Sequence, residues 1–174
     1  MENQNKVRAD LRQLKPFFIV AFVGIIYHLR IRPMAGDDVF FSQATSELGL
    51  WNYLIQRYET WTSRFVIEFL LVWIIKYPIL WRLIDLALFI SFPVLISKIF
   101  DGGKLLDWCA AAAVLLYPFH DMGTAGWITT TVNYFWPVWG MFFVGFLLKK
   151  MLVHKKINIV EGIAGCLLYT SPSP

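Results

Sequence analysis

The amino-acid sequence predicts an all-α protein, a multi-pass transmembrane helical bundle with an amphipathic juxtamembrane helix in its first external loop. Hydrophobic residues make up 57% of the 174 residues and charged residues 16%, whereas a soluble domain carries about 25% charged residues. The apolar residues gather in blocks that, with their aromatic flanks, approach the ~17–25 residues needed to cross a hydrocarbon core. The basic residues stand in short clusters between these blocks, which indicates membrane topology and argues against a nucleic-acid-binding surface.

The first apolar block follows a basic N-terminus. Residues 1–15 contain four Lys and Arg residues, and the block then begins at Pro16. A secretory signal peptide has the same order of basic and apolar regions. The sequence HLRIR follows the block, however, and the small-residue cleavage pattern around Met34 is poor. We therefore predict an uncleaved first span over about residues 16–32, with the N-terminus in the cytoplasm.

The first polar loop, residues 33–63, contains an amphipathic pattern. Its apolar residues recur at spacings of three and four, and polar residues fill most of the other positions. The repeating apolar positions are Phe40, Ala44, Leu48, Trp51, Ile55 and Tyr58. This period indicates an amphipathic helix that is broken or bent near Gly49. The helix is too polar to span the bilayer, and we expect it to lie along the membrane surface.

Later apolar blocks predict further spans over about residues 79–99, 105–119, 134–148 and from 157 onward. The block over residues 65–77 is short and contains Glu68, and we interpret it as a re-entrant or juxtamembrane helix. The basic sequence KKMLVHKK and the N-terminal cluster are then both cytoplasmic. The loops 33–63 and 118–133 are both external in this topology. If the block crosses the membrane instead, the second loop moves inside.

The C-terminal residues 166–174, CLLYTSPSP, interrupt an apolar run and resemble translated vector or adaptor sequence. We expect this tail to be non-native. Residues 1–165 would then be the N-terminal part of a single integral membrane domain in a larger protein. The two cysteines, Cys109 and Cys166, form neither a disulfide framework nor a metal-binding spacing.

An acidic pair, Asp37 and Asp38, follows the first predicted span and directly precedes three apolar residues. One interpretation is local, because Asp is a favoured N-cap and either residue can cap a helix that begins near Val39. Another is simple solvation of a loop. A functional interpretation is a general base, or a ligand of a divalent cation beside a phosphate, at the outer membrane face. These interpretations are compatible, since one residue can cap while its neighbour reacts.

The order of these features resembles the GT-C superfamily of glycosyltransferases. The resemblance rests on the acidic pair, the amphipathic helix, YETWTSRF (residues 58–65) and WITTTVNYFW (residues 127–136). It is nearer to bacterial cell-surface and O-antigen glucosyltransferase-like proteins, which include families of unknown function, and it covers residues 16 to about 150. The sequence departs from the family pattern at Val39, Ser63, Thr130 and Thr131.

The resemblance implies a membrane glycosyltransferase in the bacterial cytoplasmic membrane. Such an enzyme moves a sugar from a polyprenyl-phosphate donor to a cell-envelope glycan on the outer face. Its partners are the lipid-linked sugar, the glycan acceptor and the lipid bilayer, with no nucleic acid. Asp37 and Asp38 are then the expected catalytic residues. Arg64 is the expected phosphate-binding residue, because its guanidinium matches phosphate oxygens. Alternatively, Arg64 is an interfacial anchor or a partner of Glu68.

In the later loop, Asn133 and Tyr134 are expected to hydrogen-bond the sugar, and Trp127 or Trp136 is expected to stack on it. Trp and Tyr are also ordinary interfacial anchors, which is the alternative for this segment. A divalent cation is the one cofactor that the sequence suggests. The sequence does not decide whether the protein needs this cation. The candidate ligands are Asp38, His120 and Asp121, although a loop His-Asp pair is often only solvated.

Two other functions compete with the transferase. In a transporter or flippase subunit, Glu68 and Asp85 would line a translocation path, because ionisable residues inside apolar blocks are functional candidates. Asp85 can instead pair with Arg82, three residues earlier on the same helix. A noncatalytic multi-pass membrane protein is the third possibility, and only the aromatic content favours it.

Overall fold

A computed structural model describes residues 2–46, 48–61, 64–101, 103–118, 126–153, 158–159 and 161–163, with side chains from Leu14 onward. Every regular element within these ranges is a helix. The all-α prediction is therefore confirmed for this part of the chain. The predicted span from residue 157 is described only at isolated positions, and the tail 166–174 lies outside the described residues.

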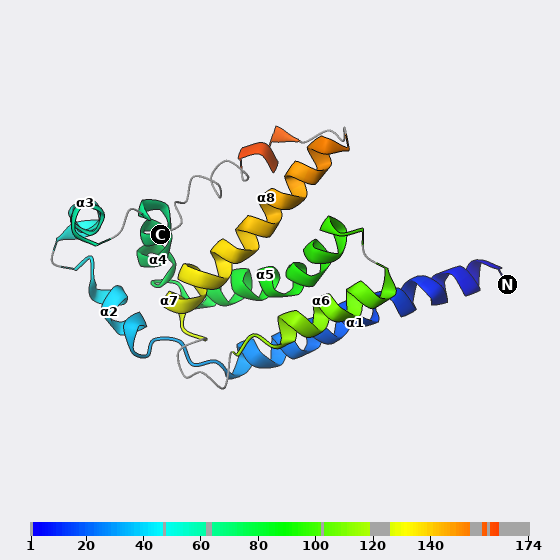
Figure 1. Ribbon diagram of the computed structural model, residues 1–174. Coiled ribbons are helices and arrows are strands. Elements are labelled where there is room, and N and C mark those ends of the chain that lie inside the picture. The colour runs from blue at the N-terminus through cyan, green and yellow to red at the C-terminus, as the bar shows by residue number, and fades with distance from the viewer. Residues whose placement is uncertain are drawn as a thin grey trace.

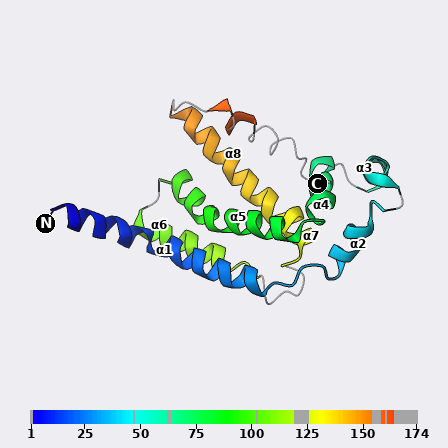
Figure 2. The same cartoon turned by 180° about the vertical axis from the view of Figure 1, so that it is seen from behind.

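Four long helical segments form the body of the molecule (Figures 1 and 2). These are α1 (Glu2–Arg30), α5 (Pro78–Ile99), α6 (Lys104–Leu115) and a continuous segment made of α7 (Ile128–Thr130), the π-helical η1 (Thr131–Phe135) and α8 (Trp136–Leu152). α5 lies at the centre and contacts α1, α6 and α8, while α1 also contacts α6. Successive long helices run in opposite directions, so their connections alternate between two ends.

Basic residues lie at both ends of the bundle, and several lysines gather at one of them. At one end, here called the site end, α1 and α6 finish while α5 and α7 begin (left in Figure 1). At the other, here called the basic end, Lys149 Nζ donates to the carbonyl oxygen of Lys98 at 2.9 Å and pairs with Asp101. Lys104 and Lys150 lie in the first and last turns of the helices that meet there. The lysine clusters that are separate in the sequence are thus gathered at one end.

Three further helices, α2 (Asp37–Gln43), α3 (Gly49–Thr60) and α4 (Phe65–Ile74), gather at the site end (Figure 1). The amphipathic segment forms two helices, and the second begins at Gly49, whose φ of +71° suits glycine best. α4 has 10 residues, which gives about 15 Å of helix against a hydrocarbon core of about 30 Å. It contacts α2, α3 and η1 and so stays at the site end.

Among the residues that the structure describes, two helices are long and apolar enough to cross a membrane, by length and composition, namely Pro78–Ile99 and Ile128–Leu152. The predicted span 79–99 falls within the first of them. The predicted span 134–148 lies inside the second, which begins earlier, at Ile128. α6 ends at Leu115 and is shorter than the predicted span 105–119, because Tyr117 and Pro118 have already left the helix.

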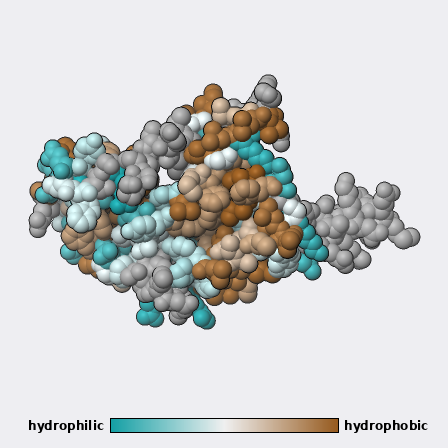
Figure 3. All heavy atoms as spheres, viewed as in Figure 1, coloured by the Kyte–Doolittle hydropathy of each residue, from teal (hydrophilic) through white to brown (hydrophobic). Residues whose placement is uncertain are grey.

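Apolar side chains occupy both the inside and the outside of the bundle. One buried cluster surrounds Trp81 and joins α3, α4 and the start of α5 to residues 128–132. A second surrounds Phe89 and joins α1, α5 and α6 to η1. Large apolar side chains also face outward, and Figure 3 shows them as a broad hydrophobic surface over the long helices. An exposed apolar surface of this extent is typical of a membrane- or protein-binding face.

The close approach of α1 to α5 at Gly24 can be tested by substitution. A Cβ at this position would lie 2.8 Å from Phe89 Cδ1 and 3.2 Å from Leu86 Cδ1. We expect Gly24→Ala to lower the free energy of unfolding by about 1–3 kcal/mol, because the core is already filled there. Denaturation in detergent measures the change.

Gly145→Ala is the matched control, since a Cβ there meets nothing within 4 Å and the residue also lies inside a long helix. We expect this change to be neutral or to stabilise by up to ~1 kcal/mol through helix propensity. Equal responses of the two variants would contradict tight packing at Gly24.

Candidate functional site

The side chain of Asp38 joins the two halves of the predicted site. It is completely buried. Its Oδ1 accepts hydrogen bonds from the backbone N–H and the hydroxyl of Thr129, both at 2.8 Å. Its Oδ2 accepts from the backbone N–H groups of Ile128 at 3.1 Å and Met34 at 3.0 Å. The first loop and the segment 127–136, which are far apart in the sequence, therefore meet at the site end.

The carboxylate of Asp38 acts as a helix cap that comes from another part of the chain. The first N–H groups of a helix have no partner within the helix and carry partial positive charge, so they favour a buried anion. Trp127, the N-cap residue of α7, provides no side-chain hydrogen bond. The expectation that an aspartate caps a helix near Val39 is wrong, because α2 begins at Asp37 and its N-cap Gly36 makes no side-chain hydrogen bond. Asp38 instead lies in the first turn of α2 and caps α7.

Asp37 has the opposite environment to its neighbour. It is exposed, whereas Asp38 is buried, because consecutive residues of a helix point in different directions. A carboxylate has about four acceptor positions, and donors fill four on Asp38. The geometry thus divides the pair, with Asp38 holding the two loops together and Asp37 accessible to a solute. The filled acceptors also leave Asp38 poorly suited to bind a cation.

Trp127 packs on the backbone of Gly36, one residue before the acidic pair. A Cβ on Gly36 would lie 2.0 Å from Cη2 of the indole and 2.5 Å from Cζ3, and its φ is +54°. Both the space and the backbone conformation therefore require glycine. Trp127 is half-buried and uses this ring edge to fix the first loop against the second.

Asn133 and Tyr134 lie on η1, a wide helical turn of a type that often occurs at functional sites. Asn133 Nδ2 donates to the carbonyl oxygen of Thr129 at 2.9 Å. Its Oδ1 is buried and has no hydrogen-bond partner among the described residues, which is unusual for a buried acceptor. Tyr134 points outward and is 64% exposed. One side chain of this pair thus supports the turn, and the other reaches the surface.

Tyr134 also lines an apolar cavity of about 490 Å³. Side chains from α5, α6, η1 and α8 form its walls, including Phe92, Val114, Val138 and Phe142. Its polar side chains are the phenols of Tyr117 and Tyr134. The cavity therefore connects the turn at the site end with the apolar interior of the long helices.

Arg64, the candidate phosphate-binding residue, is half-buried and directly precedes α4. The buried Glu68 on α4 pairs with Arg57 of α3, whose Nη2 lies 3.1 Å from Oε1. Tyr53 also donates to Glu68, at 3.4 Å. Burial, followed by the charge of Glu68, raises the pKa of Tyr53 to about 12, so its hydroxyl remains a donor at neutral pH. Glu68 thereby ties α4 to α3.

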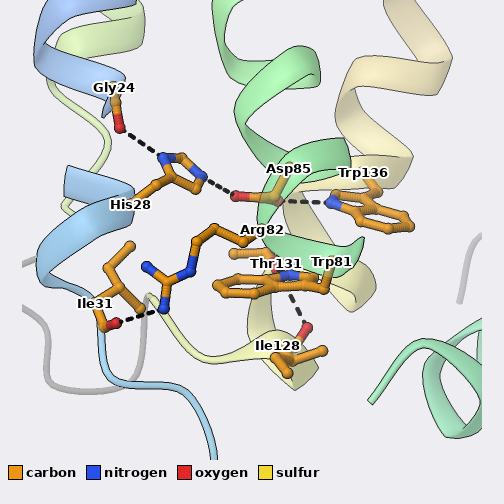
Figure 4. Close-up of polar contacts among 9 residues, drawn as sticks. All are labelled: Gly24, His28, Ile31, Trp81, Arg82, Asp85, Ile128, Thr131 and Trp136. Carbon is orange, nitrogen blue, oxygen red and sulfur yellow. Dashed lines mark hydrogen bonds and ion pairs between the residues drawn. The ribbon is translucent and has the colours of Figure 1, made fainter. Parts of the chain in front are cut away.

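Asp85 takes part in a buried network that the sequence analysis missed (Figure 4). His28 Nε2 lies 2.9 Å from Asp85 Oδ2, and Trp136 Nε1 donates to Oδ1 at 2.6 Å. The expected Arg82–Asp85 pair is replaced, since Arg82 Nη2 donates to the carbonyl oxygen of Ile31 at 3.0 Å. The signal in the sequence was a histidine inside an apolar run, which needs a polar partner when buried.

The candidate cation ligands His120 and Asp121 lie outside the described residues. Among the residues that the structure describes, no group of three His, Cys, Asp or Glu side chains is arranged to hold a metal ion.

The contribution of Asp38 to stability can be measured directly. In Asp38→Asn, an amide NH2 would replace one carboxylate oxygen and would face either the donors of Thr129 or the backbone N–H groups of Ile128 and Met34. We expect the free energy of unfolding to fall by about 2–4 kcal/mol, because buried hydrogen bonds to a charged group are lost. Asp37→Asn is the control and should change stability by less than about 0.5 kcal/mol, since Asp37 is exposed. Equal losses of unfolding free energy in the two variants would contradict the assignment of the structural role to Asp38 alone.

Comparisons with known proteins complete the description of the site. No protein-family model, no curated protein and no solved structure matches this chain. The resemblance to GT-C glycosyltransferases therefore stays a prediction.

Proposed function

We propose that the protein is a membrane glycosyltransferase. It transfers a sugar from a polyprenyl-phosphate donor to a cell-envelope glycan outside the bacterial cytoplasmic membrane. The single observation that carries this proposal is the contact between Asp38 and residues 128–129. It unites the two loops that the resemblance assigns to the active site and leaves the carboxylate of Asp37 exposed beside them.

The lysines at the basic end, together with the basic N-terminal residues, support a multi-pass orientation with a cytoplasmic N-terminus. The lysines Lys98, Lys104, Lys149 and Lys150 mark the basic end, and basic residues are retained on the cytoplasmic side of membrane proteins. The site end is then external. α4 is too short to reverse this order and packs with α2 and α3 at the site end.

A lipid-linked donor keeps its isoprenoid chain in the bilayer and its phosphate at the interface. The apolar cavity between α5, α6 and α8 has the chemistry to hold such a chain, since its lining is almost entirely hydrocarbon. Tyr134 lines this cavity and also lies on η1. Asp38 binds the N–H groups of residues 128 and 129, just before η1. A chain in the cavity would thus bring the phosphate toward the turn that carries Tyr134.

The proposed reaction needs a base and a stabilised leaving group. The carboxylate of Asp37 removes the proton from an acceptor hydroxyl, whose oxygen then attacks the anomeric carbon of the sugar. The bond from that carbon to the phosphate oxygen breaks, and polyprenyl phosphate leaves with the electron pair. The guanidinium of Arg64 stabilises the developing negative charge. Attack from the face opposite the phosphate inverts the anomeric configuration.

The transporter alternative relied on Glu68 and Asp85 as members of a translocation path. Both are buried and have protein partners, Arg57 and Tyr53 for the first and His28 and Trp136 for the second. Their presence in apolar helices is explained by these contacts. The transferase therefore accounts for more of the described polar side chains.

Asp37→Asn tests the catalytic role in the full-length protein. We expect the rate of sugar transfer from a radiolabelled polyprenyl-phosphate donor to fall by about 100-fold or more, because a general base contributes 10²–10⁴-fold. The control is Asp101→Asn, which removes an exposed carboxylate at the basic end. Activity of Asp37→Asn equal to wild type would exclude Asp37 as the base.

The proposed orientation can be tested by labelling single cysteines in intact cells. Cys109 and Cys166 are first replaced by Ser. We expect an impermeant maleimide to label Phe40→Cys, which is 60% exposed in α2 at the site end. Lys104→Cys at the basic end should react only after the membrane is opened. The reverse pattern would place the candidate site in the cytoplasm.

A further inference from the structure

The network of His28, Asp85 and Trp136 lies directly inside the site end and links three long helices (Figure 4). His28 is 1% exposed and Asp85 is completely buried. Asp85 belongs to the central helix α5, and its two carboxylate oxygens face different helices. One contacts His28 of α1, and the other accepts from Trp136 at the start of α8.

The contacts of His28 require a proton on each of its two ring nitrogens, one more than a neutral imidazole carries. Its Nδ1 lies 2.7 Å from the carbonyl oxygen of Gly24, which only accepts, so Nδ1 must carry hydrogen. Its Nε2 lies 2.9 Å from a carboxylate oxygen. This second contact is a hydrogen bond only if a proton lies between the two atoms. Because the carboxylate also receives the Trp136 N–H, its ionised form is favoured and the proton belongs on Nε2.

The segment 127–136 is held at three points along its length. Asp38 binds its first N–H groups. Trp81 Nε1 donates to Thr131 Oγ1 at 2.8 Å, and Thr131 donates in turn to the carbonyl oxygen of Ile128. Asp85 binds Trp136 at the other end of η1. The wide turn that carries Asn133 and Tyr134 is thus fixed on both sides, twice by side chains of α5.

We propose that His28 and Asp85 are positioning residues that hold Trp136, and with it η1, in the geometry needed at the site end. The imidazolium fixes the carboxylate, and the carboxylate fixes the indole. Stability alone gives little reason for such a pair, because apolar residues of similar volume often replace a buried ion pair without loss. The structural role stands by itself, whereas its effect on catalysis rests on the proposed transferase function.

Hydrogen exchange of the full chain in nanodiscs tests the structural role. We expect the amides of residues 127–136 to exchange at least about tenfold faster in Asp85→Asn, because one anchor of the turn is lost. The control is Asp107→Asn. Asp107 is also a buried carboxylate, but it accepts from Ser97 near the basic end.

The two variants separate positioning from general destabilisation. Faster exchange confined to 127–136 in Asp85→Asn, with no change there in Asp107→Asn, supports the proposal. An unchanged segment, or the same acceleration in both variants, overturns it. If Asp85→Asn does not fold, Trp136→Phe removes only the indole donor, and we expect it to accelerate exchange in the same segment.

Nuclear magnetic resonance of ¹⁵N-labelled histidine tests whether both ring nitrogens of His28 carry a proton. The signals of His28 are assigned from their loss in His28→Gln. We expect two ring N–H signals for His28 in the wild type and one in Asp85→Asn. A single ring N–H signal in the wild type would overturn the imidazolium assignment.

The hydrogen-exchange and resonance measurements do not involve sugar transfer. If the transferase assay fails, they still test the structural role of His28 and Asp85. If the transferase function holds, Asp85→Asn should lower kcat about tenfold or more with little change in KM for the lipid donor. Asp107→Asn should leave both constants unchanged. A kcat unaffected by Asp85→Asn would overturn the catalytic consequence of the positioning role.

Discussion

The structure of the site end depends on one buried carboxylate. Asp38 accepts the first N–H groups of the helix that begins at Ile128 and the backbone N–H of Met34 in the first loop. A buried anion is costly unless donors surround it, and a helix start has unpaired donors together with a favourable dipole. Each group therefore satisfies the other. Because these donors belong to two distant parts of the chain, satisfying them brings the loops together and forms the candidate site.

The same rule governs the other buried carboxylates that the structure describes. Glu68 has Arg57 and Tyr53, Asp85 has His28 and Trp136, and Asp107 has Ser97. Each of these contacts joins two different helices. In a bundle that is apolar on its outer surface as well as inside, hydrophobic burial alone distinguishes poorly between alternative helix arrangements. Polar contacts with fixed geometry select one arrangement, since any other leaves a buried charge without a partner.

This arrangement gives the acidic pair two separate tasks. The carboxylate of Asp38 is fully occupied by hydrogen bonds within the protein. Asp37, the preceding residue in the same helical turn, is exposed to solvent. The glycine before the pair allows Trp127 to lie against the backbone, which packs the second loop on the first. An exposed carboxylate on a rigid support, in a molecule that also has an apolar cavity lined by an exposed tyrosine, is a suitable arrangement for chemistry on an amphipathic substrate.

The sequence by itself determined the helical class, the approximate positions of α5 and α8, the break near Gly49 and the residues of the two loops, because periodicity and composition are local properties. It placed the cap of an aspartate at the wrong helix, the one near Val39. Only the tertiary structure decided that Asp38 caps the helix at Ile128, that Glu68 pairs with Arg57 and that Asp85 pairs with His28. The sequence favoured near neighbours such as Arg82 for these partners, because spacing along one helix is visible in a sequence whereas helix packing is not. Buried charges choose partners by three-dimensional proximity, and that follows from how the whole bundle packs.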